Sequence, residues 1–182
     1  AIGVSKNTVI EYVTERMLFG SGVDKNHVVT SSVPVLPERL QLLLSGQIKA
    51  ATLPDPLGYS AIQAGAVEVV NDLKISDLSA SVISFSTAVV ENNSEAIQQF
   101  VKAWDRAAAD LNTDPDAFRS LMLQKIRVPK NVRDSYPIPQ YPRNKNVSRQ
   151  QWDDAVDWLL EKNLLKAPVS YEDSVTDEFL RN

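Results

Sequence analysis

Six polar or turn-forming residues could contact a ligand, and they fall in three short stretches of the sequence. Two stretches directly follow an apolar run, residues 2–4 in one case and 48–53 in the other. A stretch between a strand and a helix offers backbone N–H groups and the positive end of the helix dipole, which attract an anionic or carbonyl group. A carboxylate there can face a cationic or hydroxylated ligand. The candidate ligand-binding residues are Ser5, Asn7, Thr8, Ser32, Pro54 and Asp55.

The same residues also have an explanation that involves no ligand. Ser5 or Asn7 can cap a helix that begins near Val9, since their side chains accept hydrogen bonds from the first backbone N–H groups of a helix. Asp55 can cap the next helix in the same way. The two roles do not exclude each other, so the sequence leaves both open.

The sequence offers little for catalysis or metal binding. His27 is the only histidine and there is no cysteine, which excludes a histidine metal cluster, thiolate ligands and a cysteine nucleophile. No Gly-x-Ser-x-Gly elbow is present. Asp153, Asp154 and Asp157 lack the spacing and the glycine turn of a calcium loop. We therefore expect no enzymatic activity, no cofactor and no metal.

Composition narrows the class of protein further. The 182 residues are 43% hydrophobic and 23% charged, with a net charge of -4. No apolar run approaches the roughly 18 residues that indicate a membrane helix. No basic cluster is present, which argues against a nucleic-acid partner. Residues 1–4 indicate a first strand rather than an export signal.

The elements that position the candidate residues alternate between strand and helix over the first 80 residues. Helices are predicted at about 9–18, 37–44 and 57–64, and strands at 2–4, 28–33, 48–53 and 67–70. Gly46 should end the second helix in the left-handed conformation. Alternating elements imply a mostly parallel sheet, and ligands bind beyond the carboxyl ends of such strands. The candidate residues should therefore line one continuous depression.

The pattern changes after residue 71. Residues 72–80 read as a polar connection and 82–90 as a long extended run, while everything later reads as helical apart from a proline-rich extended segment at 136–142. One helix should run from Ser94, as a cap, to about Leu111, and Ser148 with Gln151 forms a capping-box pattern before another. The predicted division is 1–81, 82–90 and 91–182, and the last part has helices but no sheet of its own.

Several segments resemble a known family, the solute-binding proteins of ABC importers, in the branch that includes nitrate, sulfonate, taurine and thiamine-precursor binders. The resemblance covers nearly the whole chain, and no single motif in it is as specific as a nucleotide-binding loop. Its segments are Ile2-Gly3-Val4-Ser5, Glu38-Arg39, Leu44-Ser45-Gly46-Gln47-Ile48-Lys49-Ala50-Ala51, Leu53-Pro54-Asp55-Pro56, Ile97-Gln98-Gln99-Phe100-Val101-Lys102-Ala103-Trp104, Trp158-Leu159-Leu160-Glu161-Lys162-Asn163-Leu164-Leu165 and Ser170-Tyr171-Glu172-Asp173.

The resemblance implies an α/β fold of the periplasmic-binding-protein-like type II, with two lobes and a ligand held between them. Residues 1–81 would be the second lobe, 82–90 a crossing strand and hinge, and 91–182 helices of the first lobe, whose opening strands are missing from this chain. The implied function is capture of a small organic molecule or oxyanion for an ABC permease. The implied location is periplasmic or extracytoplasmic, with any lipid anchor outside this chain. The alternative is an effector-binding regulatory domain or an enzyme of the same fold.

Without those strands, apolar side chains of the later helices would lie exposed, beyond what soluble monomers usually show. We therefore also expect self-association through residues 91–182. The side chains concerned are Phe100, Trp104, Phe118, Trp152, Trp158 and Leu159.

Overall fold

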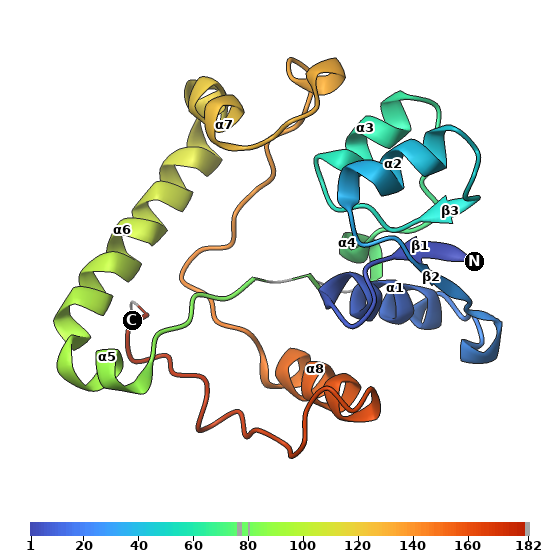
Figure 1. The fold of residues 1–182 in the computed structure, drawn as a ribbon. Helices are drawn as coiled ribbons and strands as arrows, with labels where there is room; N and C mark the ends of the chain where they lie inside the picture. The colour runs from blue at the N-terminus through green and yellow to red at the C-terminus, as the bar shows by residue number, and fades with distance from the viewer. Residues whose placement is uncertain (76–77, 80, 181–182) are drawn as a thin grey trace. The chain divides into compact units, whose positions relative to one another are not determined.

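A three-stranded parallel sheet organises the first part of the chain. The computed structural model describes residues 1–75, 78–79 and 81–180 of the 182. Strand β1 (Ile2–Val4) is central, between β2 (Thr30–Ser32) and β3 (Ala50–Ala51), as Figure 1 shows. Both pairings are parallel, which confirms the parallel sheet predicted from the alternating pattern.

Helices cover both faces of this sheet. In Figure 1, α2 (Leu36–Leu44) and α3 (Leu57–Gln63) lie on one side and α1 (Val9–Gly20) on the other. A strand covered on both sides can bury all its side chains, and Val4 is accordingly fully buried. The apolar core around the sheet includes Val4, Tyr12, Val13, Met17, Leu40 and Ala61.

The helix end predicted at Gly46 is confirmed. Gly46 has a φ of +74°, and its N–H donates to the carbonyl of Leu43 at 3.0 Å. A residue with a Cβ rarely adopts this conformation, so glycine fixes the point at which α2 stops and the chain turns towards β3.

Two predicted strands are wrong. Residues 67–70 form no strand, and the side chains of Val67 and Val69 are 84% and 89% exposed. Residues 82–86 have no regular structure, and 87–92 form helix α5 (Thr87–Asn92). An apolar extended pattern becomes a strand only if another strand pairs with it, and the sequence pattern carries no information about that partner.

The polar connection predicted at 72–80 contains a short helix, α4 (Asp72–Ile75). Ser76, Asp77 and Ala80, which belong to the same predicted connection, lie outside the described residues. The third strand is also shorter than the predicted 48–53, because only Ala50 and Ala51 pair with β1.

The later part of the described chain is helical only in part: it has no strand, but residues 133–148 and 162–180 form no helix, unlike the prediction for 162–180. Its α-helices are α6 (Ser94–Thr113), α7 (Arg119–Lys125) and α8 (Arg149–Glu161), with 3₁₀ turns η2 (Asp116–Phe118) and η3 (Lys130–Val132). A further 3₁₀ turn, η1 (Lys25–His27), lies in the earlier part. The helix cap predicted at Ser94 is wrong by one position, since Asn93 precedes the first helical residue.

The capping box at the start of α8 is confirmed. The Ser148 N–H donates to Gln151 Oε1 at 3.0 Å, and the Gln151 N–H donates back to Ser148 Oγ at 3.2 Å. Each side chain thus satisfies a backbone donor of the other at the helix start.

The chain forms two compact units. The first unit contains residues 1–80, 128–136 and 158–166, and the second contains 81–127, 137–157 and 167–182. Two segments from the later half of the sequence therefore fold with the sheet. The assignment of 1–81 and 91–182 to two lobes, with 82–90 as the hinge between them, stays a prediction, although 82–90 forms no strand.

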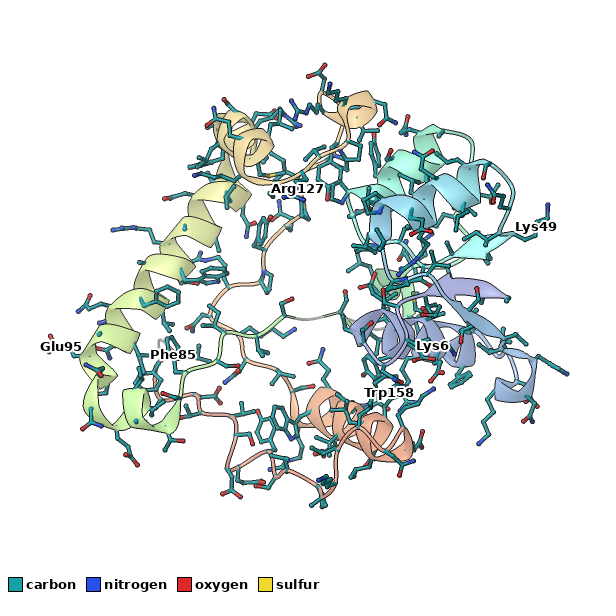
Figure 2. All side chains as sticks on the ribbon, in the orientation of Figure 1. Lys6, Lys49, Phe85, Glu95, Arg127 and Trp158 are labelled. Carbon is teal, nitrogen blue, oxygen red and sulfur yellow. The ribbon has the colours of Figure 1, made fainter. Side chains whose placement is uncertain are left out.

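Trp158 shows what one of these segments does. Its side chain is 3% exposed, and its ring meets that of Tyr12 edge to face with centroids 5.6 Å apart (Figure 2). Its indole N–H donates to Glu15 Oε2 at 2.7 Å. Including Trp158 among the exposed apolar side chains was therefore wrong, because α1 covers it. Phe100 and Trp104 of that set are 45% and 55% exposed.

Candidate functional site

Three loops meet at the carboxyl ends of the three parallel strands. We call residues 5–8, 32–35 and 52–55 the carboxyl edge; 5–8 and 52–55 follow β1 and β3, and 32–35 starts at Ser32, the last residue of β2. Since β1 pairs with both neighbours in parallel, these loops leave the sheet on the same side. All six predicted site residues belong to the carboxyl edge. That they line one continuous depression stays a prediction.

Thr8, rather than Ser5 or Asn7, caps α1. Its Oγ1 accepts the Ile10 N–H at 3.2 Å and donates to the carbonyl of Ser5 at 2.8 Å. Asn7 has a positive φ of 59°, and its N–H donates to Glu11 Oε2 at 2.7 Å. The structural explanation thus holds for Thr8, and the Asn7 N–H is already used within the protein.

Asp55 also has a structural contact. Its Oδ1 accepts the Tyr59 N–H at 3.0 Å, so it stabilises the first turn of α3. The carbonyl of Pro54 accepts from Leu57 and Gly58 at 3.0 and 3.2 Å. The Asp55 side chain is nevertheless exposed, which leaves its carboxylate accessible to a ligand.

Two predicted residues carry polar side chains without a hydrogen-bond partner among the described residues. Asn7 and Ser32 are both exposed, and neither side chain forms a hydrogen bond with another residue in the part of the chain that the structure describes. Asn7 lies on the loop after β1, and Ser32 is the last residue of the adjacent strand β2. An amide and a hydroxyl can each donate and accept, so this pair is available to bind a polar group.

Arg39 organises the edge, and the sequence analysis did not single it out as a site residue. Its guanidinium is fully buried and donates to the carbonyls of Val33 and Thr52 at 2.8 and 2.7 Å and to Ser5 Oγ. Burial lowers the pKa of Arg39. A signal for it was available, because Arg39 falls between Leu36 and Leu40 on the apolar face of α2, where an arginine rarely lies unless it has partners.

Glu11 supports the edge from α1 and was also missed. It is 2% exposed, and its carboxylate lies 3.1 Å from Lys6 Nζ and 3.7 Å from Lys162 Nζ. Lys6 is labelled in Figure 2. Burial alone would raise its pKa, but the Asn7 N–H and the two lysines hold the pKa of Glu11 below its ordinary value. The loop carrying Asn7 is thus tied to an ionised glutamate.

A separate cavity lies within the second unit, on α6, η2 and α7. Its volume is about 300 Å³, and its lining is almost entirely apolar. None of the six predicted site residues lines it. The lining residues are Trp104, Ala107, Ala108, Leu111, Phe118, Leu121, Met122, Lys125, Ile126 and Tyr141.

Metal chemistry has no candidate site among the described residues. Across 1–75, 78–79 and 81–180, no group of three or more His, Cys, Asp and Glu side chains is arranged to hold a metal ion. His27 lies in η1 and is exposed. Within the same ranges, none of the helices combines the length and apolar character needed to cross a membrane.

Comparison with known proteins gives one family. A model of the NMT1-like family matches residues 2–126, which is more than half of the chain and includes all six predicted site residues together with Arg39 and Glu11. No curated protein matches the chain.

Proposed function

The chain belongs to the NMT1-like family, and from that premise we propose that it is the solute-binding component of an ABC importer. Membership indicates a solute-binding type of function rather than an enzymatic one. The importer role goes further than the family match. It is supported by the resemblance of segments such as residues 44–51 and 97–104 to the binding proteins of the nitrate, sulfonate, taurine and thiamine-precursor branch.

The ligand is a small organic molecule or oxyanion that binds at the carboxyl edge. The observation that carries this proposal is the pair of accessible side chains Asn7 and Ser32, at the carboxyl ends of the adjacent parallel strands β1 and β2, which form no hydrogen bond with the described residues. Ser5 and Asp55 lie on the same edge and can add polar contacts. Thr8 and Pro54 shape the loops, because both make contacts within the protein. The mechanism is binding and release, without a chemical step.

The partners follow from this role. The ligand-bound protein delivers its cargo to an ABC permease, and closure on the ligand presents the surface that the permease recognises. The protein works in the periplasm or another extracytoplasmic space, and it reaches the membrane through the permease or a lipid anchor outside these 182 residues. The periplasmic-binding-protein-like type II fold is part of the same proposal.

A thermal-shift screen of the full-length protein tests the proposal. The compounds are nitrate, taurine, cytosine and benzoate, which represent the oxyanions, sulfonates, pyrimidines and aromatic acids. A compound that binds only the folded state adds about 2.7 kcal/mol of stability at a hundred times its Kd, so a true ligand raises the unfolding midpoint in a concentration-dependent manner.

The control is a variant of the two unused side chains. Asn7→Gly combined with Ser32→Ala should leave the unliganded midpoint almost unchanged, since neither side chain has a partner among the described residues and glycine keeps the positive φ of position 7. The double variant should remove most of the ligand-induced shift. A full shift in this double variant would place the binding site elsewhere in the molecule. No shift with any of the four compounds would contradict the proposed function.

A further inference from the structure

The guanidinium of Arg39 joins all three loops of the carboxyl edge. It donates from Nε to Val33 O after β2, from Nη1 to Thr52 O after β3, and from Nη2 to Ser5 Oγ in the loop after β1. The Ser5 hydroxyl in turn donates to Pro34 O at 3.3 Å. The three acceptors lie 28, 19 and 47 positions apart in sequence when taken pairwise, so only the folded sheet brings them within reach of one side chain.

Arginine suits this position better than any other residue. Its five N–H donors lie in one rigid plane, so it can satisfy several acceptors in fixed directions at once. Lysine has one ammonium on a flexible stem and cannot reach the three loops with the same geometry. Gly3 leaves room for the stem, because a Cβ there would lie 3.4 Å from Arg39 Cγ and 2.9 Å from Ile48 Cδ1.

Burying a charge at this position costs desolvation free energy. Arg39 is fully buried and forms no ion pair within the described ranges; its hydrogen bonds there go to neutral oxygens. A buried charge often stabilises a fold less than an apolar side chain of similar volume does. Glu11 shows the contrast, since it is also buried but has two lysines beside it. Stability alone therefore gives a poor account of an arginine at this position.

We infer that Arg39 is the positioning residue of the carboxyl edge, holding Ser5, the end of β2 at Ser32, and Pro54–Asp55 in the arrangement that receives the ligand. The ligand part of this inference rests on the proposed function. Val33 directly follows Ser32, and Thr52 precedes Pro54 by two residues, so fixing their carbonyls fixes the neighbouring site residues. Arg39 acts through these loops and through the Ser5 hydroxyl, and it does not itself reach the surface.

Amide hydrogen exchange measures this positioning without any ligand. The reporters are the N–H groups of Val33 and Thr52, which donate to Val4 O and Gly3 O at 2.8 and 3.1 Å. In Arg39→Met these two amides should exchange about tenfold faster or more, while amides within α6 of the second unit keep their wild-type rates. Wild-type rates at Val33 and Thr52 in a folded variant would overturn the inference.

Two further variants separate positioning from general stability. Arg39→Lys keeps the charge and most of the stem, so it provides a folded protein if Arg39→Met fails to fold, and it should show the same local increase. Leu40→Ala removes packing from the neighbouring, 7% exposed residue of α2. This control should lower the unfolding midpoint. It should leave unchanged the ratio between the exchange rates of the Val33 and Thr52 amides and the exchange rates of the amides in α1. If Leu40→Ala raised that ratio as much as Arg39→Lys does, the role of Arg39 would be only structural.

A ligand arm completes the test. The ligand is whichever of nitrate, taurine, cytosine and benzoate binds the wild-type protein, and binding is measured under conditions in which the variants are folded. Arg39→Lys should raise the Kd about tenfold or more. Leu40→Ala should change the Kd by less than about twofold. Equal affinities in wild type and Arg39→Lys would overturn the positioning role in binding. If none of the four compounds binds the wild type, the proposed function fails, and the exchange rates still decide whether Arg39 holds the edge.

Discussion

The first unit has a sheet at its centre, whereas the second has helices and irregular segments but no strand within the described residues. Large side chains are buried to different extents in the two units. In the first, the fully buried positions include charged and polar side chains, such as Glu11, Thr14 and Arg39, each with hydrogen-bonding partners. In the second, α6 keeps Phe100 and Trp104 about half exposed beside an open apolar cavity.

The difference follows from the presence of a sheet. Helices on both faces of a sheet enclose a space in which polar groups can be buried once each has a partner. A helix pair without a sheet covers only one stripe of each helix. In the second unit no other element covers Phe100 and Trp104 of α6 or Leu121 of α7 completely, so solvent reaches these apolar side chains. Both units hold buried charged groups with specific partners, Arg39 in the first and Asp105 in the second, but the second also leaves Phe100 and Trp104 exposed.

The largest difference in stability should come from comparing two tryptophans, Trp158 of the first unit and Trp104 of the second. Trp158→Ala removes a side chain that is 3% exposed and packed on Tyr12, and it should cost about 3–5 kcal/mol of unfolding free energy. Trp104→Ala removes one that is 55% exposed, and it should cost about 1 kcal/mol or less. Urea unfolding followed by circular dichroism measures both. Equal losses would show that the two units protect their aromatic residues alike.

A smaller effect is expected from Glu11. Glu11→Gln should cost about 1–3 kcal/mol at pH 7, since it removes charge-assisted hydrogen bonds to Lys6 and the Asn7 N–H. The exposed Glu38 in the first turn of α2 is the control, and Glu38→Gln should change stability by about 0.5 kcal/mol or less.

The pH dependence of the same variant sharpens this prediction. The fold holds the pKa of Glu11 below the ordinary 4.5, so the stability that its ionised form adds is complete above about pH 4.5 and is lost as pH falls through the folded pKa. The difference in urea midpoint between wild type and Glu11→Gln should therefore shrink below that pH. A difference that is constant from pH 7 to pH 3 would contradict the assignment.

Two aspartates of the second unit give the next comparison. Asp105 is 4% exposed and accepts from Arg143 Nη2 at 2.6 Å and Nε at 3.2 Å, which raises the pKa of Arg143. Asp116 pairs with Arg119, but its side chain is 79% exposed. Asp105→Asn should lower the unfolding midpoint clearly, and Asp116→Asn should alter the free energy by about 0.5 kcal/mol or less. Thermal unfolding in low and high salt distinguishes them, since salt screens only the exposed pair strongly.

The smallest effect on folding should come from the exposed apolar surface of α6, where we predict self-association. Trp104→Lys should reduce the oligomer fraction in sedimentation velocity at micromolar concentration and leave unfolding almost unchanged. Val69→Lys, at an 89% exposed position of the first unit, is the matched control and should leave association as in the wild type. A wild-type protein that remains monomeric would contradict the prediction.

The elements that depend on neighbouring residues were predictable. The helix end at Gly46, the capping box at Ser148 and the start of α1 near Val9 all follow from side chains within a few positions of one another. The strands predicted at 67–70 and 82–90 failed because a strand needs a partner that local sequence does not name. The prediction that Trp158 is exposed was wrong for a related reason. A helical apolar pattern indicates that a face of the helix is buried, but it does not tell which other element covers that face.

For the candidate site, the sequence determined that three loops with polar residues follow three strands, and alternation with helices determined that those strands run parallel. Only the tertiary structure decided what each side chain does there. It brings Arg39 of α2 to acceptors in all three loops, Glu11 of α1 to the Asn7 N–H, and Lys162 of the later chain to Glu11. Such contacts join residues up to 151 positions apart in sequence, and contacts at that separation depend on the packing of the sheet and helices, to which many parts of the chain contribute.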